Sequence, residues 1–331
     1  MLDAYLFDEH HAKKIEHHAK KIEAWADALD DLDESQVLWL DLLEPSAEEA
    51  RKVGEALGLD GLEPGRFHAE GVQPAFDQGQ EYLRVTALAA RDAEADASET
   101  VAVDCFVGEN WVLTAHSTEL AVIEDFRAWT EGEGKIGILD APSFLAVLLE
   151  WVVTSYLRAF DKIEVELEEF DVRVLRSARR DAERQISALV EVRRRVGSLR
   201  RSLAPHREVF AALSDSEFDP VSSEESAKRF SGLATKTETA LAAARDTKDA
   251  VIGSFDVLIA RTEHRTNEIV KVLTMASILL LPGALIAGVM GMNVNFKTSV
   301  FAHSPLFWVV VGAIILIALA TLGVARIRRW I

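Results

Sequence analysis

The sequence predicts an α+β domain, with an α/β N-terminal part followed by long helices, and then two C-terminal transmembrane helices. Two stretches without charged residues, Val272–Met290 and Leu306–Ala325, are each about as long as the roughly 20 residues of a membrane helix. Before them, short β-type runs give way after Pro142 to almost continuous helical periodicity. We therefore expect residues 1–268 to form a cytosolic domain and residues 269–331 to form a transmembrane domain.

The N-terminal part contains four runs rich in β-branched and aromatic residues. These expected strands are Val37–Leu40, Glu81–Ala87, Val101–Val107 and Trp111–Ala115. After the first of them, Ser46 and Glu49 have the spacing of a capping box, which predicts the start of a helix. The single cysteine, Cys105, excludes an intrachain disulfide, and we expect it to be a buried strand residue.

Three helices are expected after the strands. They are Pro142 to about Arg179, Asp181 to about Leu213, and a helix from Ser223 into the first apolar stretch. Pro205 should bend or interrupt the second helix, because proline lacks the backbone N–H that a helix interior needs. An unbroken last helix would be roughly 100 Å long at 1.5 Å per residue.

Acidic residues are confined to the part that precedes the membrane segments. The formal net charge is −18, yet no Asp or Glu follows Glu268. A surface this acidic disfavours nucleic acid as a partner. It is compatible with the attraction of cations, and equally with plain solubility.

Basic residues flank the pair of apolar stretches at its two outer ends. Arg261, Arg265 and Lys271 precede the first stretch, and Arg326, Arg328 and Arg329 follow the second. The positive-inside rule then places both termini in the cytoplasm, with spans of about 270–290 and 306–325 and an outer loop of about 291–305. We expect a multi-pass protein of the plasma (cell inner) membrane. Two helices cannot enclose a pore, so any transport would require several copies.

The last cytosolic helix carries acidic residues on one face. Asp249, Asp256 and Glu263 recur every seven residues, and Asn267 follows four residues later. On an isolated helix this pattern is an ordinary solvated stripe. Around the axis of an oligomer, the same residues would form rings of carboxylates that concentrate cations.

A short motif follows the first apolar stretch directly: Gly291-Met292-Asn293, then a short loop and the second stretch. In this position the sequence resembles the CorA family of magnesium transporters, whose signature is Gly-Met-Asn at this point. Four further segments are similar to that family: Asn267–Thr274, Leu281–Gly288, Asp41–Pro45 and Ala204–Val209.

The resemblance implies a funnel-shaped homopentamer in the lipid bilayer, with the first membrane helix lining a pore for divalent cations. It places the selectivity asparagine at Asn293, beside Gly291, and a pore-neck aspartate at Asp256, so these three would contact the metal ion. Leu273 and Leu281 would be apolar constrictions that gate the pore by dewetting; without the resemblance, packing against lipid or another helix explains them equally well. The implied pore-facing positions are Asn267, Val270, Thr274, Ser277, Leu281, Ala284 and Gly288.

Amide and backbone oxygens suit Mg²⁺ because this small ion gives up its water reluctantly. Such neutral oxygens can hydrogen-bond the hydrated ion without holding it too long for transport. The loop Val294–His303 departs from the family, because it contains Lys297 and no carboxylate. Val270 and Ala284 also differ from the methionine and threonine that the family often has at these positions.

Three functional hypotheses follow. The first is a Mg²⁺ channel, with Co²⁺ and Ni²⁺ as further candidate ions, gated by cation binding in the cytosol. There, Glu164, Glu166, Glu168 and Glu169 would be either regulatory ligands or a solvated helix surface. The second is a Zn²⁺ transporter of the ZntB-like branch, coupled to protons. Histidines that support it are His303 and those of a tandem heptad expected to be helical, His10, His11, His17 and His18.

The third hypothesis is a membrane-anchored enzyme or signalling protein. The sequence has no glycine-rich phosphate loop, Ser/His/Asp arrangement or metal-hydrolase spacing, so we do not expect an enzyme.

Overall fold

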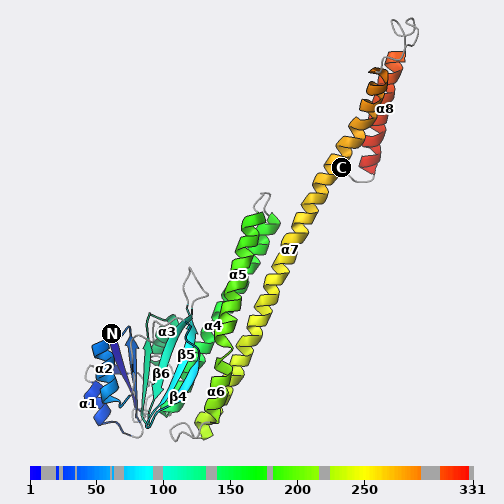
Figure 1. Cartoon of the computed structure of the whole chain (residues 1–331). Helices are drawn as coiled ribbons and strands as arrows, with labels where there is room; N and C mark the ends of the chain where they lie inside the picture. Colours follow the sequence, from blue (N-terminus) through cyan, green and yellow to red (C-terminus); the bar gives the residue numbers. More distant parts are fainter. Residues whose placement is uncertain are drawn as a thin grey trace. The chain divides into compact units, whose positions relative to one another are not determined.

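The computed structural model describes residues 1–8, 20–21, 25–33, 36–59, 62, 71–91, 100–131, 140–176, 182–215, 224–291 and 306–327 (Figure 1). The chain divides into two compact units, Met1–Phe255 and Asp256–Ile331. Helix α7 (Glu224–Gly291) contributes residues to both units. Each unit is described by itself below.

The first unit contains a mixed sheet with the strand order β2-β1-β3-β7-β6-β5-β4. Its strands are β1 (Leu2–Asp8), β2 (Lys20–Lys21), β3 (Gln36–Leu43), β4 (Ala75–Gln78), β5 (Leu83–Ala90), β6 (Thr100–Val107) and β7 (Trp111–His116). β3 and β7 pair in parallel, and the other neighbouring strands pair antiparallel. The four strands expected from the sequence are confirmed, as β3, β5, β6 and β7.

The expectation of a helical tandem heptad is wrong at Lys20–Lys21. These two residues form β2, in which Lys21 pairs with Tyr5 and Lys20 with Leu6 of β1. The pairing satisfies backbone groups at the free edge of β1, which a helix could not do. The other residues of the tandem heptad lie outside the described part of the chain.

Helices cover both faces of the sheet, as the α/β prediction for this part requires. On one face, Leu38, Leu40 and Leu42 of β3 pack with α1 (Trp25–Asp30) and α2 (Ala47–Ala56). On the other face, the Trp39 ring lies 5.3 Å from Phe126 of α3 (Ala121–Glu131) and 5.7 Å from Phe144 of α4 (Ala141–Arg176). The alternation follows from the two-residue period of a strand.

Two local predictions in this unit are confirmed. The Ser46 hydroxyl oxygen accepts a hydrogen bond from the Glu49 N–H at 3.2 Å, and the Glu49 carboxylate accepts one from the Ser46 N–H at 2.9 Å. This reciprocal capping box begins α2. Cys105 is fully buried in β6.

The long helices begin close to the expected residues. Pro205 separates α5 (Ala182–Leu203) from α6 (His206–Ser214), which confirms the predicted interruption. An apolar window of α4 is long enough to cross a membrane, but 67% of it is buried inside the first unit. That burial makes α4 a core helix. The corresponding window of α7 has 0% buried, and α8 (Leu306–Ile327) is also apolar.

One side of α7 is buried in the first unit. Eight of its buried residues are spaced alternately by three and four: Phe230, Leu233, Thr237, Ala240, Ala244, Thr247, Val251 and Ser254. α4 lies beside this part of α7 (Figure 1). The Thr247 hydroxyl donates to Glu164 at 2.9 Å, and Lys236 pairs with Glu150 at 2.6 Å.

Candidate functional site on helix α7

Three acidic residues of α7, Asp249, Asp256 and Glu263, lie on the side opposite its buried stripe. Asp249 is two residues from both Thr247 and Val251, so it points about 200° around the helix from each of them. Asp256 and Glu263 continue the seven-residue repeat. All three carboxylates are exposed and form no ion pair with any residue in the described part of the chain. They form a stripe of negative charge that no described residue of this chain neutralises.

In the second unit, α8 covers one side of α7. A Cβ atom added to Gly283 would lie 3.4 Å from the Ile314 Cγ2 atom of α8, so the two helices are in close contact there (Figure 1). The α7 residues that are partly buried in this unit from residue 267 onward include Met275, Pro282, Gly283 and Ile286. Ile286 lies on the side that α8 covers. Ala284 and Gly288 are each two residues from Ile286, about 200° around the helix, and therefore face away from α8.

The side of α7 that faces away from α8 carries the positions expected to line a pore. They are separated by three or four residues and are all exposed: Asn267, Val270, Thr274, Ser277, Leu281, Ala284 and Gly288. We call this set the outward face. Asp256 is exposed and continues the same spacing toward the N-terminus. Leu273 is also exposed and lies beside the outward face, one residue before Thr274. Such spacing keeps side chains on one side of a helix and is typical of helices that pack around a common axis.

The hydroxyl groups of the outward face can accept hydrogen bonds from water. The Thr274 hydroxyl donates its proton to the Val270 carbonyl oxygen at 2.8 Å, and the Ser277 hydroxyl donates to the Leu273 carbonyl oxygen at 2.9 Å. With their protons used inside the helix, both oxygens keep lone pairs for outside donors. The water shell of a cation consists of such donors, so this face is suited to a hydrated ion.

The signature motif begins where α7 ends. Gly291 is the last residue of α7 and lies three residues after Gly288, so it continues the outward face. Met292 and Asn293 lie outside the described residues, as does the loop that contains Lys297. The five histidines of the zinc hypothesis, His10, His11, His17, His18 and His303, lie outside them as well.

The acidic cluster of α4 makes contacts within the chain. Glu164 accepts the hydrogen bond from Thr247 of α7, Glu166 pairs with Arg195 of α5 at 2.8 Å, and Glu169 pairs with Arg173 at 3.4 Å. Glu168 makes none of these contacts. Across the described ranges, no three His, Cys, Asp or Glu side chains come together as a metal site within one chain.

A buried charged network at the ends of β3 and β7 was not expected from the sequence. The Asp41 carboxylate accepts hydrogen bonds from Thr114 at 2.5 Å and Arg127 at 2.9 Å, and lies 3.2 Å from His116 Nε2. Burial opposes ionisation of both partners, but their mutual contact outweighs it: the pKa of Asp41 is lowered and the pKa of His116 is raised. In the sequence, the signal for this network was Asp41, a charged residue within an apolar strand. The network joins α3 to the sheet.

Residues 34–326 match the model of a family of divalent-cation transporters, described as CorA-like Mg2+ transporter protein. The chain therefore belongs to this family, whose members are membrane transporters and not enzymes.

Individual relatives agree with this assignment. The cobalt/magnesium transport protein CorA of Methanocaldococcus jannaschii is 22% identical over 299 residues, which are 89% of this chain and 92% of that protein. The complete structure of the CorA magnesium transporter from the same organism matches with a TM-score of 0.75 at 20% identity, covering 99% of this chain and 98% of that one. The fold is thus that of a full-length CorA protein.

A zinc-transporter domain also has a similar fold. The cytoplasmic domain of ZntB from Vibrio parahaemolyticus matches with a TM-score of 0.58 at 13% identity and covers 80% of this chain and 99% of that domain. This likeness concerns the fold alone.

Proposed function

We propose that this chain is one subunit of a homopentameric Mg²⁺ channel of the plasma (cell inner) membrane. In this proposal α7 lines the ion pathway and α8 lies outside it. The observation that carries it is the outward face of α7, which runs at three- and four-residue spacing from Asn267 to Gly288 on the side away from α8. That face leads directly into the Gly291-Met292-Asn293 motif.

Several copies of the chain are needed to form the pathway. A single helix face cannot enclose a channel, whereas a ring of identical faces can. The apolar residues of α7 and α8 support contact with lipid and with neighbouring copies, since Val272 is 69% exposed, Leu280 67% and Leu316 69% in the single chain. The number five rests on the family resemblance. We also propose two membrane spans, about 270–290 and 306–325, with both termini in the cytoplasm.

Selection of the ion is assigned to Asn293 and Gly291. Five amide side chains and five backbone carbonyls would present neutral oxygens to a hydrated Mg²⁺ ion, which keeps its water more firmly than larger ions do. Thr274 and Ser277 would receive the hydrated ion further along the same face. Co²⁺ and Ni²⁺ are further candidate ions.

Gating is assigned to cations in the cytosol. Asp249, Asp256 and Glu263 are exposed on α7 without partners in the described chain, so copies of α7 around an axis would repel one another until cations bind between them. Cation binding would therefore favour one of two arrangements of the helices. Leu281 and Leu273 would close the pathway by excluding water.

The alternative is a proton-coupled Zn²⁺ transporter of the ZntB-like branch. The fold likeness to a ZntB cytoplasmic domain supports it. The sequence likeness to a cobalt/magnesium transport protein over 89% of this chain supports the Mg²⁺ channel instead. The two functions differ in the transported ion and in the need for a pH gradient.

Ion uptake into liposomes that contain the purified protein tests the proposal. We expect Mg²⁺ entry that does not depend on a pH gradient, and loss of ion selectivity in Asn293→Ala with the oligomer intact. Asn295→Ala is the matched control, because it removes another amide from the same loop and should leave uptake unchanged. Zn²⁺ entry that is stimulated by a pH gradient would support the alternative. Flux of neither ion would contradict both.

A further inference from the structure

A groove between α5 and α7 in the first unit is lined by basic residues. It has a volume of about 680 Å³ and is lined by Val190, Arg193, Arg194, Val196, Gly197, Arg200, Arg201, Ala204, Ala244 and Lys248. Five of these residues are basic and none is acidic. The groove is thus a local concentration of positive charge on a chain whose formal net charge is −18.

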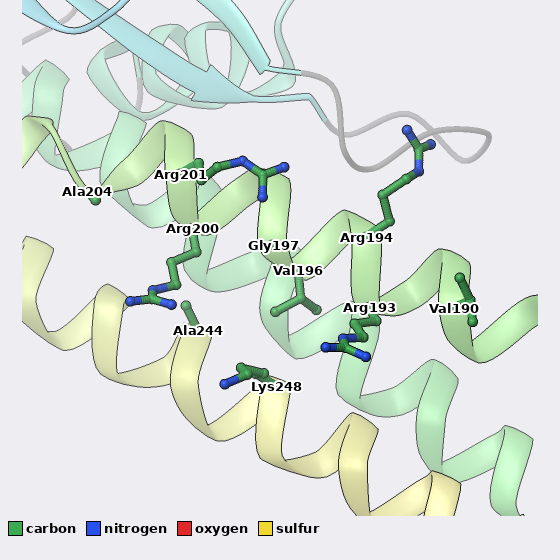
Figure 2. A pocket seen from close by; sticks show the side chains of 10 residues that line it. All are labelled: Val190, Arg193, Arg194, Val196, Gly197, Arg200, Arg201, Ala204, Ala244 and Lys248. Atoms are coloured by element: carbon green, nitrogen blue, oxygen red, sulfur yellow. The ribbon is translucent and has the colours of Figure 1, made fainter.

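Three of the cations reach into the space between the two helices. Figure 2 shows Arg193 and Arg200 extending from α5 toward α7, where Lys248 lies, whereas Arg194 extends away from α7 and Arg201 lies along α5. Arg193 and Arg200 are seven residues apart, which places them on one side of α5 at a separation of about 10 Å along its axis.

These three cations have no anionic partner within the described chain. Arg194 pairs with Glu191 at 2.7 Å, but Arg193, Arg200 and Lys248 form no ion pair with any described residue. Like charges that converge on one groove repel one another, and a bound anion would remove this repulsion. A guanidinium group can also bind a phosphate through two parallel hydrogen bonds.

The floor of the groove is apolar. Val196 and Ala244 are buried beneath it, and Gly197 lies beside the Arg201 guanidinium, whose Nη1 atom would be 3.4 Å from an added Cβ atom. The groove therefore offers apolar surface beside its cations, within the roughly 300–1,000 Å³ typical of small-molecule sites.

We propose that this groove binds a small phosphate-bearing molecule of nucleotide size, with its phosphates on Arg193, Arg200 and Lys248 and its uncharged part on Val196, Gly197 and Ala244. The ion pathway of α7 does not include these residues.

Calorimetric titration of the purified full chain with ADP, in detergent and EDTA, tests this site without a transport measurement. We expect one ADP per chain and no binding of adenosine, which lacks the phosphates. Arg193→Gln and Arg200→Gln should each weaken ADP binding by about tenfold, because each removes a charged hydrogen-bond donor. Arg184→Gln is the matched control, since Arg184 is exposed on the same helix outside the groove.

A second variant fills the groove and keeps its charges. Gly197→Leu should weaken ADP binding while the helix stays intact, because leucine favours a helix more than glycine does. Absence of ADP binding to the unmodified chain would overturn the proposal, as would equal affinities of Arg200→Gln and Arg184→Gln. If the unmodified chain does not bind ADP and Arg200→Gln dissociates the oligomer, the groove instead binds carboxylates of a second copy.

Discussion

Leu281 and Leu279 are the same residue type, two positions apart, on different sides of α7. Leu281 belongs to the outward face and is 64% exposed, whereas Leu279 is 39% exposed and lies nearer the α8 side. We expect Leu281→Ala to raise Mg²⁺ flux severalfold at the high internal Mg²⁺ that should close the channel, because a smaller side chain lets water into an apolar constriction. Flux into liposomes at high internal Mg²⁺ measures this effect.

The control for this prediction is Leu279→Ala, which should leave the closed channel closed. If both variants leak equally, the effect belongs to general loosening of the helices. If neither leaks, Leu281 is not a constriction.

His206 makes the stability of the first unit sensitive to acid. Its Nε2 atom accepts a hydrogen bond from the Leu88 N–H at 2.9 Å, and its Nδ1–H donates to the Leu203 carbonyl oxygen at 3.2 Å. Burial lowers the pKa of His206 from 6.5 to about 4, because the interior disfavours the charged ring. The ring is therefore neutral in the folded chain near neutral pH.

The sign of the pH dependence follows from this lowered pKa. The unfolded chain takes up a proton near pH 6.5 and the folded chain does not, so the stabilisation is complete above pH 6.5 and falls as the pH drops toward 4. The loss should reach roughly 3 kcal/mol at the lower end of this window. Hydrogen exchange of the β5 amides, corrected for intrinsic rates, should show it. His206→Phe should flatten this slope, whereas His264→Gln, at an exposed position, should retain it.

Spacing alone placed Asp249, Asp256, Glu263 and Asn267 on one helix face, and the family resemblance added the other positions expected to line a pore. The direction in which that face points could not be predicted, because it depends on which residues α8 covers. Gly283 and Ile314, which make that contact, are about thirty residues apart in the sequence, and no local pattern joins them. The role of Asn293 stays a prediction.

At the scale of elements, Gly283 controls the contact between α7 and α8. We expect Gly283→Leu to weaken this contact, because even a Cβ atom would lie 3.4 Å from Ile314 Cγ2. Yield of monodisperse protein in detergent, and its thermal aggregation temperature, should both fall.

Gly288→Leu is the comparison for this prediction. An added Cβ atom at Gly288 would meet nothing within 4 Å, and Gly288 lies on the outward face. This variant should fold and assemble normally and yet carry little ion flux. The same loss of yield in both variants would contradict the assignment of the two sides of α7.

Elements with a strong local pattern were predictable from the sequence, and elements held by long-range pairing were not. β3, β5, β6 and β7 were predictable because they are buried apolar runs. β4 is exposed along its whole length, and β2 has two residues, so both depend on a neighbouring strand that accepts their hydrogen bonds. Pro205 marked the break between α5 and α6 because its effect on a helix is local.

At the scale of the whole molecule, the acidic stripe of α7 should set the response to internal cations. We expect the pair Asp256→Asn and Glu263→Gln to shift closure to severalfold higher internal Mg²⁺, because fewer carboxylates then hold the closing cations. Flux measured against internal Mg²⁺ concentration gives this shift.

Glu268→Gln is the matched control for the acidic stripe. Glu268 is five residues after Glu263, on another side of α7, and lies 3.7 Å from His264. Its loss should leave the response to Mg²⁺ unchanged. Equal responses of the two sets of variants would make the stripe an ordinary solvated surface.

The sequence predicted the acidic stripe but not the basic groove. The arginines of α5 are visible in the sequence, but only the packing of α5 near α7 brings Lys248 close to Arg193 and Arg200. Likewise, Asp41 and Arg127 are far apart in the chain and meet only when α3 lies on the sheet. Such sites depend on tertiary contacts that no sequence period reports.

The order of the strands has a consequence for synthesis on the ribosome. Every described strand lies between Leu2 and His116, so the parallel pair β3–β7 can close the sheet once the segment ending at His116 has emerged. The apolar stretch that begins at Val272 emerges about 150 residues later, roughly 8 to 30 seconds at typical rates of translation. The sheet therefore has time to fold before the proposed membrane segments leave the ribosome. A permuted chain that began with α7 would lose this time for folding, and its apolar helices would emerge before the sheet had been synthesised.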